Sequence, residues 1–234
     1  MGMLGDEKKN VVKKTILSIF GLALFTSAIA HAVPNDIEIK GKQLIFQKPP
    51  FTFTFPSEPS MINSFSHENP EENSLTRVYF FVKAKGKQIE EMFILQIADK
   101  TNPRAEPMTV PPLKPNTEKR LYSKGKAKQD GLEVDYLIQS IRWDPKASSL
   151  QPIIQKGIVI PSRLALQGQF LFVYGGDHAV LIRYSRDVHS FGLKVSDEGK
   201  RWEKESISGN EKSAYESFQK AFVEMIHSIG IKNY

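Results

Sequence analysis

The chain has 234 residues, and 32 Lys and Arg against 26 Asp and Glu give it a formal net charge of +6. With 40% hydrophobic and 25% charged residues, the composition is typical of a globular protein and excludes a disordered chain. The sequence contains no cysteine, which excludes disulfides, thiolate metal sites, a cysteine nucleophile, c-type haem attachment and a lipid-modified N-terminal cysteine.

The N-terminus has the three parts of a secretory signal peptide. Its start is basic, an apolar run covers Ile16–Phe25, and small residues follow up to Ala32. Two A-x-A frames end at Ala30 and Ala32, and we predict cleavage after Ala32 because a polar chain begins there. We therefore expect a periplasmic or secreted protein; the alternative is an uncleaved segment that anchors the chain to the inner membrane. No later stretch approaches the roughly 20 apolar residues of a membrane span, so none is expected after signal removal.

The first part of the mature chain predicts short strands. Asp36–Ile39 and Leu44–Gln47 are expected to pair across Gly41. In Phe51–Phe55 three Phe alternate with Thr and share one face, and the flanking prolines predict an edge or terminal strand. Residues 56–74 are polar and contain three prolines, so we expect a loop there, with or without a short helical turn.

Three further strand pairs are expected, each joined by a short turn. They are Leu75–Ala84 with Glu90–Ala98, Lys119–Lys128 with Leu132–Trp143, and Leu164–Tyr174 with Ala179–Arg186. Five prolines between Thr101 and Pro115 predict a long surface loop. Asp144–Pro152 is expected to be a loop with a helical turn before Ile153, and Lys156–Ile160 a short strand.

The end of the chain predicts a covered sheet and one docked helix. Phe170–Tyr174 and Ala179–Ile182 are apolar at every position, as in strands that are buried on both faces. A helix is expected over Glu211–Ile229, because Ser208 and Glu211 have the spacing of a capping box and Gly230 marks the end. Its apolar residues fall on one narrow face at helical spacing: Tyr215, Phe218, Phe222, Met225, Ile226 and Ile229. We therefore expect the helix to pack on the sheet.

These elements predict an α+β fold: a single domain over residues 33–234 with a mainly antiparallel sheet of six to eight strands and the last helix on one face. The strand Phe51–Phe55 followed by Pro56, the last strand pair and the C-terminal helix resemble the corresponding elements of PsbP-like proteins. The resemblance implies an α/β/α sandwich with a central antiparallel sheet. It also implies a non-catalytic accessory or binding role, and no functional residue is carried over from it.

Catalytic and metal-binding motifs are absent from the sequence. It contains no G-x-S-x-G, no P-loop, no G-x-G-x-x-G and no H-E-x-x-H. Asp177, His178, Asp187 and His189 are the best candidates for a metal or acid–base site, but the strand between the two pairs separates them by roughly 26 Å. We expect Trp143 and Trp202 to pack in the core or anchor loops. No catalytic residue, no metal site and no cofactor are predicted.

Two sets of lysines have a regular spacing that predicts a binding surface. Lys83, Lys85 and Lys87 occur at every second position, as do Lys124, Lys126 and Lys128. On extended strands each set would form a row on one face, about 6.6 Å between charges. The functional interpretation is a docking site for an anionic surface, a polysaccharide or an acidic protein. The alternative is that these lysines protect an exposed sheet edge from pairing with other chains.

The expected function is therefore that of an exported, non-enzymatic accessory or binding protein. Two alternatives are a lipid or small-molecule carrier with a cavity between sheet and helix, and an enzyme whose Asp, His and Glu come from distant segments. Nucleic acid is not an expected partner, because the chain is predicted to be exported and no aromatic residue alternates with the lysines. The oligomeric state is left open.

Overall fold

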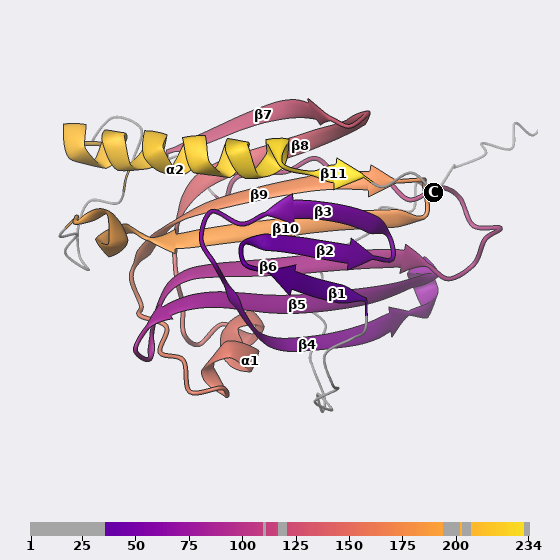
Figure 1. Cartoon of the computed structure of the whole chain (residues 1–234), viewed down its shortest axis with the longest axis horizontal. Helices are drawn as coiled ribbons and strands as arrows, with labels where there is room; N and C mark the ends of the chain where they lie inside the picture. Colours follow the sequence, from indigo (N-terminus) through magenta and orange to yellow (C-terminus); the bar gives the residue numbers. More distant parts are fainter. Residues whose placement is uncertain (1–35, 110, 117–120, 194–201, 203–206, 232–234) are drawn as a thin grey trace, which may run out of the picture.

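The computed structural model describes residues 36–109, 111–116, 121–193, 202 and 207–231. The predicted signal segment, cleavage after Ala32, and Lys119 and Arg120 lie outside these residues. The described chain forms a sheet of seven strands, a second sheet of four short strands and a C-terminal helix. Figure 1 shows the small sheet and the helix lying across the same face of the large sheet, which we call the front face. The expected mainly antiparallel α+β fold is confirmed, with a second sheet that was not predicted.

The large sheet has the strand order β4-β5-β6-β10-β9-β8-β7, and every neighbouring pair is antiparallel. Its strands are β4 (Ser60–Asn69), β5 (Ser74–Lys85), β6 (Gln88–Lys100), β7 (Tyr122–Gln129), β8 (Leu132–Arg142), β9 (Leu164–Tyr174) and β10 (His178–Asp187). The three predicted hairpins are confirmed as β5–β6, β7–β8 and β9–β10. The pairings of β6 with β10 and of β8 with β9 join the three hairpins into one sheet, with β4 and β7 at its edges.

Residues 56–74 were predicted to be a loop, and this is wrong for most of the segment, because it contains the edge strand β4. The short helical turn that the prediction allowed is present as a 3-10 helix, η1 (Pro70–Glu72). The segment is polar because β4 is an edge strand, which exposes much of its surface and forms strand hydrogen bonds with one neighbour, here β5. Polar composition therefore did not indicate a loop. An irregularity in the register between Met61 and Asn63 further obscures the alternation.

The small sheet has the order β1-β2-β3-β11, formed by β1 (Ile37–Lys40), β2 (Gln43–Gln47), β3 (Pro50–Thr54) and β11 (Gly230–Ile231). The predicted pairing of β1 with β2 is confirmed. The predicted edge position of β3 is wrong, because β11 pairs with it at Phe51 and Thr52. Phe51, Phe53 and Phe55 are all buried against the large sheet, and Phe55 lies 4.6 Å from Phe93 between ring centroids.

Helix α2 (Gly209–His227) covers the rest of the front face. Phe218 stacks on Tyr184 with ring centroids 5.0 Å apart, and Phe222 lies 5.7 Å from Phe170. Gly168 allows this approach, since a Cβ at that position would come within 2.5 Å of the Phe222 ring. The helix and sheet therefore meet in a filled aromatic core.

Both ends of α2 are set by local contacts. The predicted capping box is confirmed: Ser208 Oγ accepts from the Glu211 amide at 3.3 Å, and Glu211 Oε2 accepts from the Ser208 amide at 2.7 Å. The predicted role of Gly230 as a helix cap is wrong. Ser228 ends the helix, and Gly230 begins β11, where a Cβ would lie 2.9 Å from Thr52 Oγ1.

Replacing Ser208 with alanine should lower the stability of the protein by about 1 kcal/mol, since an amide at the start of α2 loses its acceptor. Ser213→Ala in the same helix is the matched control, because Ser213 is exposed and bonds only back to Gly209 O. Thermal unfolding of the two variants measures the difference. Equal losses would show that the capping contact does not stabilise the helix.

The opposite, back face of the large sheet is covered by short helical turns and by the proline-rich loop. The turns are η2 (Ser148–Leu150) and α1 (Gln151–Ile154). A third turn, η3 (Val188–Phe191) at the end of β10, instead packs into the front-face core through Val188. The sheet is thus covered on both faces, as the apolar strands predicted. Lys156–Ile160 is not a strand, because only Val159 makes a single bridge to Gln88. None of the described helices is long and apolar enough to cross a membrane.

Candidate functional site: a pocket on the back face

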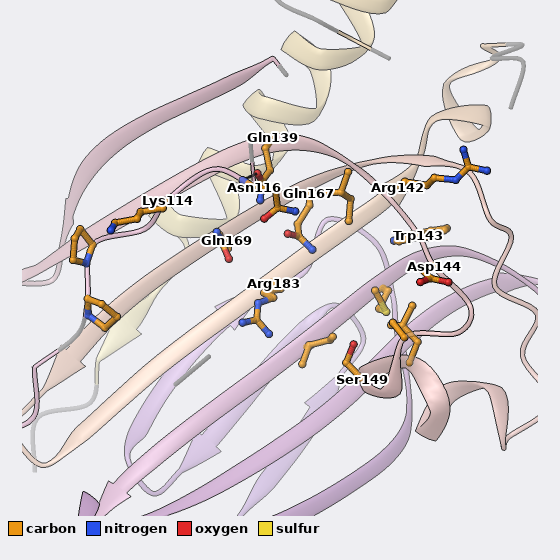
Figure 2. A pocket seen from close by; sticks show the side chains of 17 residues that line it. Lys114, Asn116, Gln139, Arg142, Trp143, Asp144, Ser149, Gln167, Gln169 and Arg183 are labelled. Carbon is orange, nitrogen blue, oxygen red and sulfur yellow. Dashed lines mark hydrogen bonds between the residues drawn. The ribbon is translucent and has the colours of Figure 1, made fainter. Parts of the chain in front are cut away.

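A pocket with a cavity volume of about 520 Å³ opens on the back face of the large sheet. Its floor is formed by strands β6, β8, β9 and β10. Residues 111–116 of the proline-rich loop form one wall, and residues 143–150, between β8 and α1, form the other. Figure 2 shows Arg183 near the middle of the ring of lining side chains, with Lys114 on one side and Ser149 on the other. The volume is in the range of small-molecule sites in proteins.

The floor of the pocket is polar, although the strands around it are apolar. Gln139, Gln167 and Ser185 are register partners on β8, β9 and β10, so their side chains form one row across the sheet. In the next row Gln169 is the partner of Arg183. These two rows bring three amides and one guanidinium onto a patch three strands wide.

Two floor contacts fix the amides in place. Gln167 Nε2 donates to Ser185 Oγ at 3.2 Å, and Gln139 Oε1 accepts from the Asn116 amide at 2.9 Å. The second bond ties the end of the proline-rich loop to the floor. Gln139 and Gln167 are therefore held in place within the pocket, which is the condition for selective binding.

Apolar clusters lie on both sides of this polar patch. One side carries Met92, Ile94, Ile141 and Leu150, which also line the pocket. On the other side is a smaller cluster of Leu113, Leu137, Leu171 and Leu181. A polar patch between two apolar clusters on a covered sheet face adds nothing to the packing of the core, since burying polar groups costs free energy. It is instead the composition of a ligand site, in which a few polar groups orient a ligand against apolar walls.

Trp143 adds a hydrogen-bond donor to the wall. Its side chain lines the pocket and is 2% exposed, and its Nε1 has no hydrogen-bond partner among the described residues. A buried indole nitrogen usually finds an acceptor. The sequence prediction that Trp143 packs in the core is confirmed.

The charge of the lining is mainly positive. Lys114, Arg142 and Arg183 line the pocket with one acid, Asp144. Arg142 donates to the carbonyl of Ser162 at 3.0 Å, so its head group is held on a neighbouring loop. Burial lowers the pKa of Arg183 to about 10, and the side chain still carries its charge at neutral pH. The pocket therefore offers a desolvated cation on its floor.

These groups can bind a ligand by hydrogen bonds and charge, but they do not form an acid–base pair. Among the described residues that line the pocket there is no histidine, and the one carboxylate, Asp144, accepts from the Lys146 amide in its own turn at 2.9 Å. This arrangement can recognise an anionic or hydrogen-bonding molecule. Proton transfer would need a second titratable group near neutral pH.

The sequence analysis missed Gln139, Gln167, Gln169 and Arg183. The signal was present in Leu166–Leu171, where two glutamines at alternate positions share one face of a strand that is otherwise apolar. Arg183 interrupts β10 in the same way. In a sheet predicted to be covered on both faces, such a polar row predicts a lined cavity, although one sequence does not show that the rows on different strands are in register.

The structure places the two lysine sets far apart. Lys124, Lys126 and Lys128 are exposed on one face of β7, an edge strand, while the residues between them are half-buried. Lys83 and Lys85 end β5, and Lys87 follows in the turn to β6. Four strands lie between β5 and β7, so the sets do not form one surface.

Acidic neighbours offset part of the lysine charge. Lys126 lies 3.4 Å from Glu133 and 3.6 Å from Asp135, and these carboxylates raise its pKa. Lys83 Nζ lies 3.5 Å from Glu91 Oε1. Docking of the lysines to an anionic surface, a polysaccharide or an acidic protein stays a prediction. The position of β7 at the sheet edge fits the protective alternative equally well.

Asp177 and His178 do not meet Asp187 and His189. They lie at opposite ends of β10, and each acid has its own partner. His178 Nδ1 lies 2.7 Å from Asp99, Asp177 pairs with Lys100 at 2.7 Å, and Asp187 pairs with Arg163. Among residues 36–109, 111–116, 121–193, 202 and 207–231, no cluster of His, Cys, Asp or Glu is suited to hold a metal ion.

Comparison with known proteins identifies no relative. No protein-family model matches the sequence, and neither a curated protein nor a solved structure matches the chain.

Proposed function

We propose that this chain is an exported, non-enzymatic binding protein that holds a small molecule in the pocket on the back face of its large sheet. The observation that carries the proposal is the polar floor of Gln139, Gln167, Gln169 and Arg183 between two apolar clusters. Three features support binding over catalysis: two fixed amides, a half-buried cation and, in the described part of the lining, no histidine. Export is supported by the basic start, the apolar run and the A-x-A frames of the N-terminus.

The resemblance to PsbP-like proteins supports the same non-catalytic role. It rests on the strand Phe51–Phe55 with Pro56, the last hairpin and the C-terminal helix, and we propose that the fold is related to their α/β/α sandwich. In this arrangement α2 forms the front helical layer, and the short turns η2 and α1 form the back layer beside the pocket.

The carrier alternative places the ligand between the sheet and the helix, and the packing there argues against it. Phe218 and Phe222 are 1% and 0% exposed, and their rings contact Tyr184 and Phe170. Side chains fill this space. The back pocket is the better position for a small molecule.

Native mass spectrometry of the protein purified from its own host tests the proposal. We expect a bound small molecule that is retained by the parent chain and lost from the variant Ser149→Trp, because the Ser149 side chain lines the pocket and an indole would occupy it. Ser148→Trp is the matched control. This neighbouring serine is exposed and does not line the pocket, so the variant should keep the ligand.

Two results would contradict the proposal. One is a parent chain recovered at its bare mass that also shows no shift in melting temperature with any member of a small-molecule library. The other is equal ligand retention by Ser149→Trp and Ser148→Trp, with both variants folded by circular dichroism. That result would show that the ligand binds outside the back pocket.

A further inference from the structure

The proposed function leaves the ligand unnamed, and the lining of the pocket indicates its chemical class. We propose that the ligand is an organic monocarboxylic acid with an apolar body, and that its carboxylate binds the guanidinium of Arg183. This inference rests on the proposed function and deepens it.

The position of Arg183 is the first step. It lies on β10, a central strand of the sheet, with Gln169 of β9 on one side and Ile94 of β6 on the other as register partners. Figure 2 shows its head group near the middle of the lining side chains. A guanidinium on the floor of a pocket is held by the sheet and meets any ligand that enters deeply.

The chemistry of this group selects the head group of the ligand. Arg presents a planar fork that matches the two oxygens of a carboxylate, and charge-assisted pairs of this kind strengthen where water is excluded. The neighbouring side chains of Gln139, Gln167 and Gln169 are neutral amides. On the walls, Lys114 adds a positive charge and Asp144 a negative one, while the Arg142 head group is held by the Ser162 carbonyl. Lys114 and Arg183 against Asp144 leave one net positive charge for the ligand. One carboxylate balances this charge, and a doubly charged phosphate exceeds it.

The walls select the body of the ligand. Met92, Ile94, Ile141 and Leu150 line the pocket on the side of the larger apolar cluster, and Pro111 and Pro112 line it from the loop. An aliphatic chain or ring placed there removes apolar surface from water on both sides. A sugar acid would instead place hydroxyl groups against these side chains and leave them without partners.

Isothermal titration calorimetry with octanoate, octan-1-ol and octyl phosphate tests the assignment. The three probes share one tail and differ in the head group. We expect octanoate to bind the parent chain more tightly than the other two probes do. Arg183→Gln should lower the affinity for octanoate by about 10- to 100-fold, because one charged hydrogen-bond partner is lost. Binding of octan-1-ol should change little in the variant. The affinity of Arg183→Lys for octanoate should lie between those of the parent chain and Arg183→Gln, because lysine keeps the positive charge and lacks the two parallel donors of the guanidinium.

Arg186→Gln is the matched control. It removes the same charge from the same strand but on the front face, where the Arg186 guanidinium lies 4.3 Å from the Phe191 ring centroid. Octanoate affinity should be unchanged. The assignment is overturned if octanoate does not bind, if the alcohol or the phosphate binds as tightly, or if Arg183→Gln keeps full affinity. If Ser149→Trp blocks the native ligand while Arg183→Gln does not affect octanoate, the carboxylate assignment fails and the proposed function stands.

Discussion

Replacing Phe222 with alanine should lower the free energy of unfolding by about 3–5 kcal/mol, the cost typical of a fully buried Phe. Phe222 is 0% exposed and lies between the rings of Phe170, Phe218 and Tyr136. Its ring also fills the space above Gly168. Removing the ring leaves a cavity between α2 and the sheet that neither rigid element can close, so we expect one of the largest losses for a single substitution in this chain.

Urea denaturation measures the effect, with Glu224→Ala as the control on the exposed face of the same helix. The control should change stability by no more than about 0.5 kcal/mol. A third variant tests the cause. Gly168→Ala should lower the free energy of unfolding of the parent chain, because its Cβ would meet the Phe222 ring. The loss should be smaller in a chain that already carries Phe222→Ala. A loss below about 1 kcal/mol for Phe222→Ala would mean that α2 is not docked as described.

Asp187→Ala should destabilise the chain by about 3–5 kcal/mol, as expected when one partner of a buried ion pair is removed. The Asp187 side chain is 3% exposed. It accepts from Arg163 Nε at 3.0 Å and from the His189 amide at 3.1 Å, so it also caps η3. The variant leaves a largely buried guanidinium and an amide without their acceptor.

Asp177→Ala is the matched comparison, because Asp177 adjoins the other end of β10 and is also ion-paired. The Asp177 side chain is 58% exposed, while its partner Lys100 is 10% exposed and also donates to the Ala105 carbonyl at 3.2 Å. Because Asp177 is exposed and Lys100 keeps a second acceptor, this variant should lose much less stability than Asp187→Ala in the same urea titration. Similar midpoints for Asp187→Ala and Asp177→Ala would show that the Asp187 pair does not stabilise the fold.

Elements with strong local signals could be predicted from the sequence. The hairpins β5–β6, β7–β8 and β9–β10 follow from apolar runs joined by short turns, and the capping box places the start of α2. Burial of Phe51, Phe53 and Phe55 follows from their alternation. In each case the information lies within a few residues of the chain, which is the range over which periodicity and turn chemistry act.

Elements that depend on distant partners could not be predicted. Strand β4 is polar and is stabilised by its pairing with β5, and β11 has two residues that are extended only because β3 lies beside them. The pocket is of the same kind. Gln139 becomes part of the site because β8, β9 and β10 align in one register, and the loop that closes the wall is tied down by a bond from Asn116.

The crystal structure of the chain grown with octanoate tests the central claim most directly. We predict that the carboxylate lies within hydrogen-bonding distance of the Arg183 guanidinium and that the tail contacts Met92, Ile94 and Ile141. Octanoate found between α2 and the sheet, or a back pocket that stays unoccupied at saturating octanoate, would contradict the account.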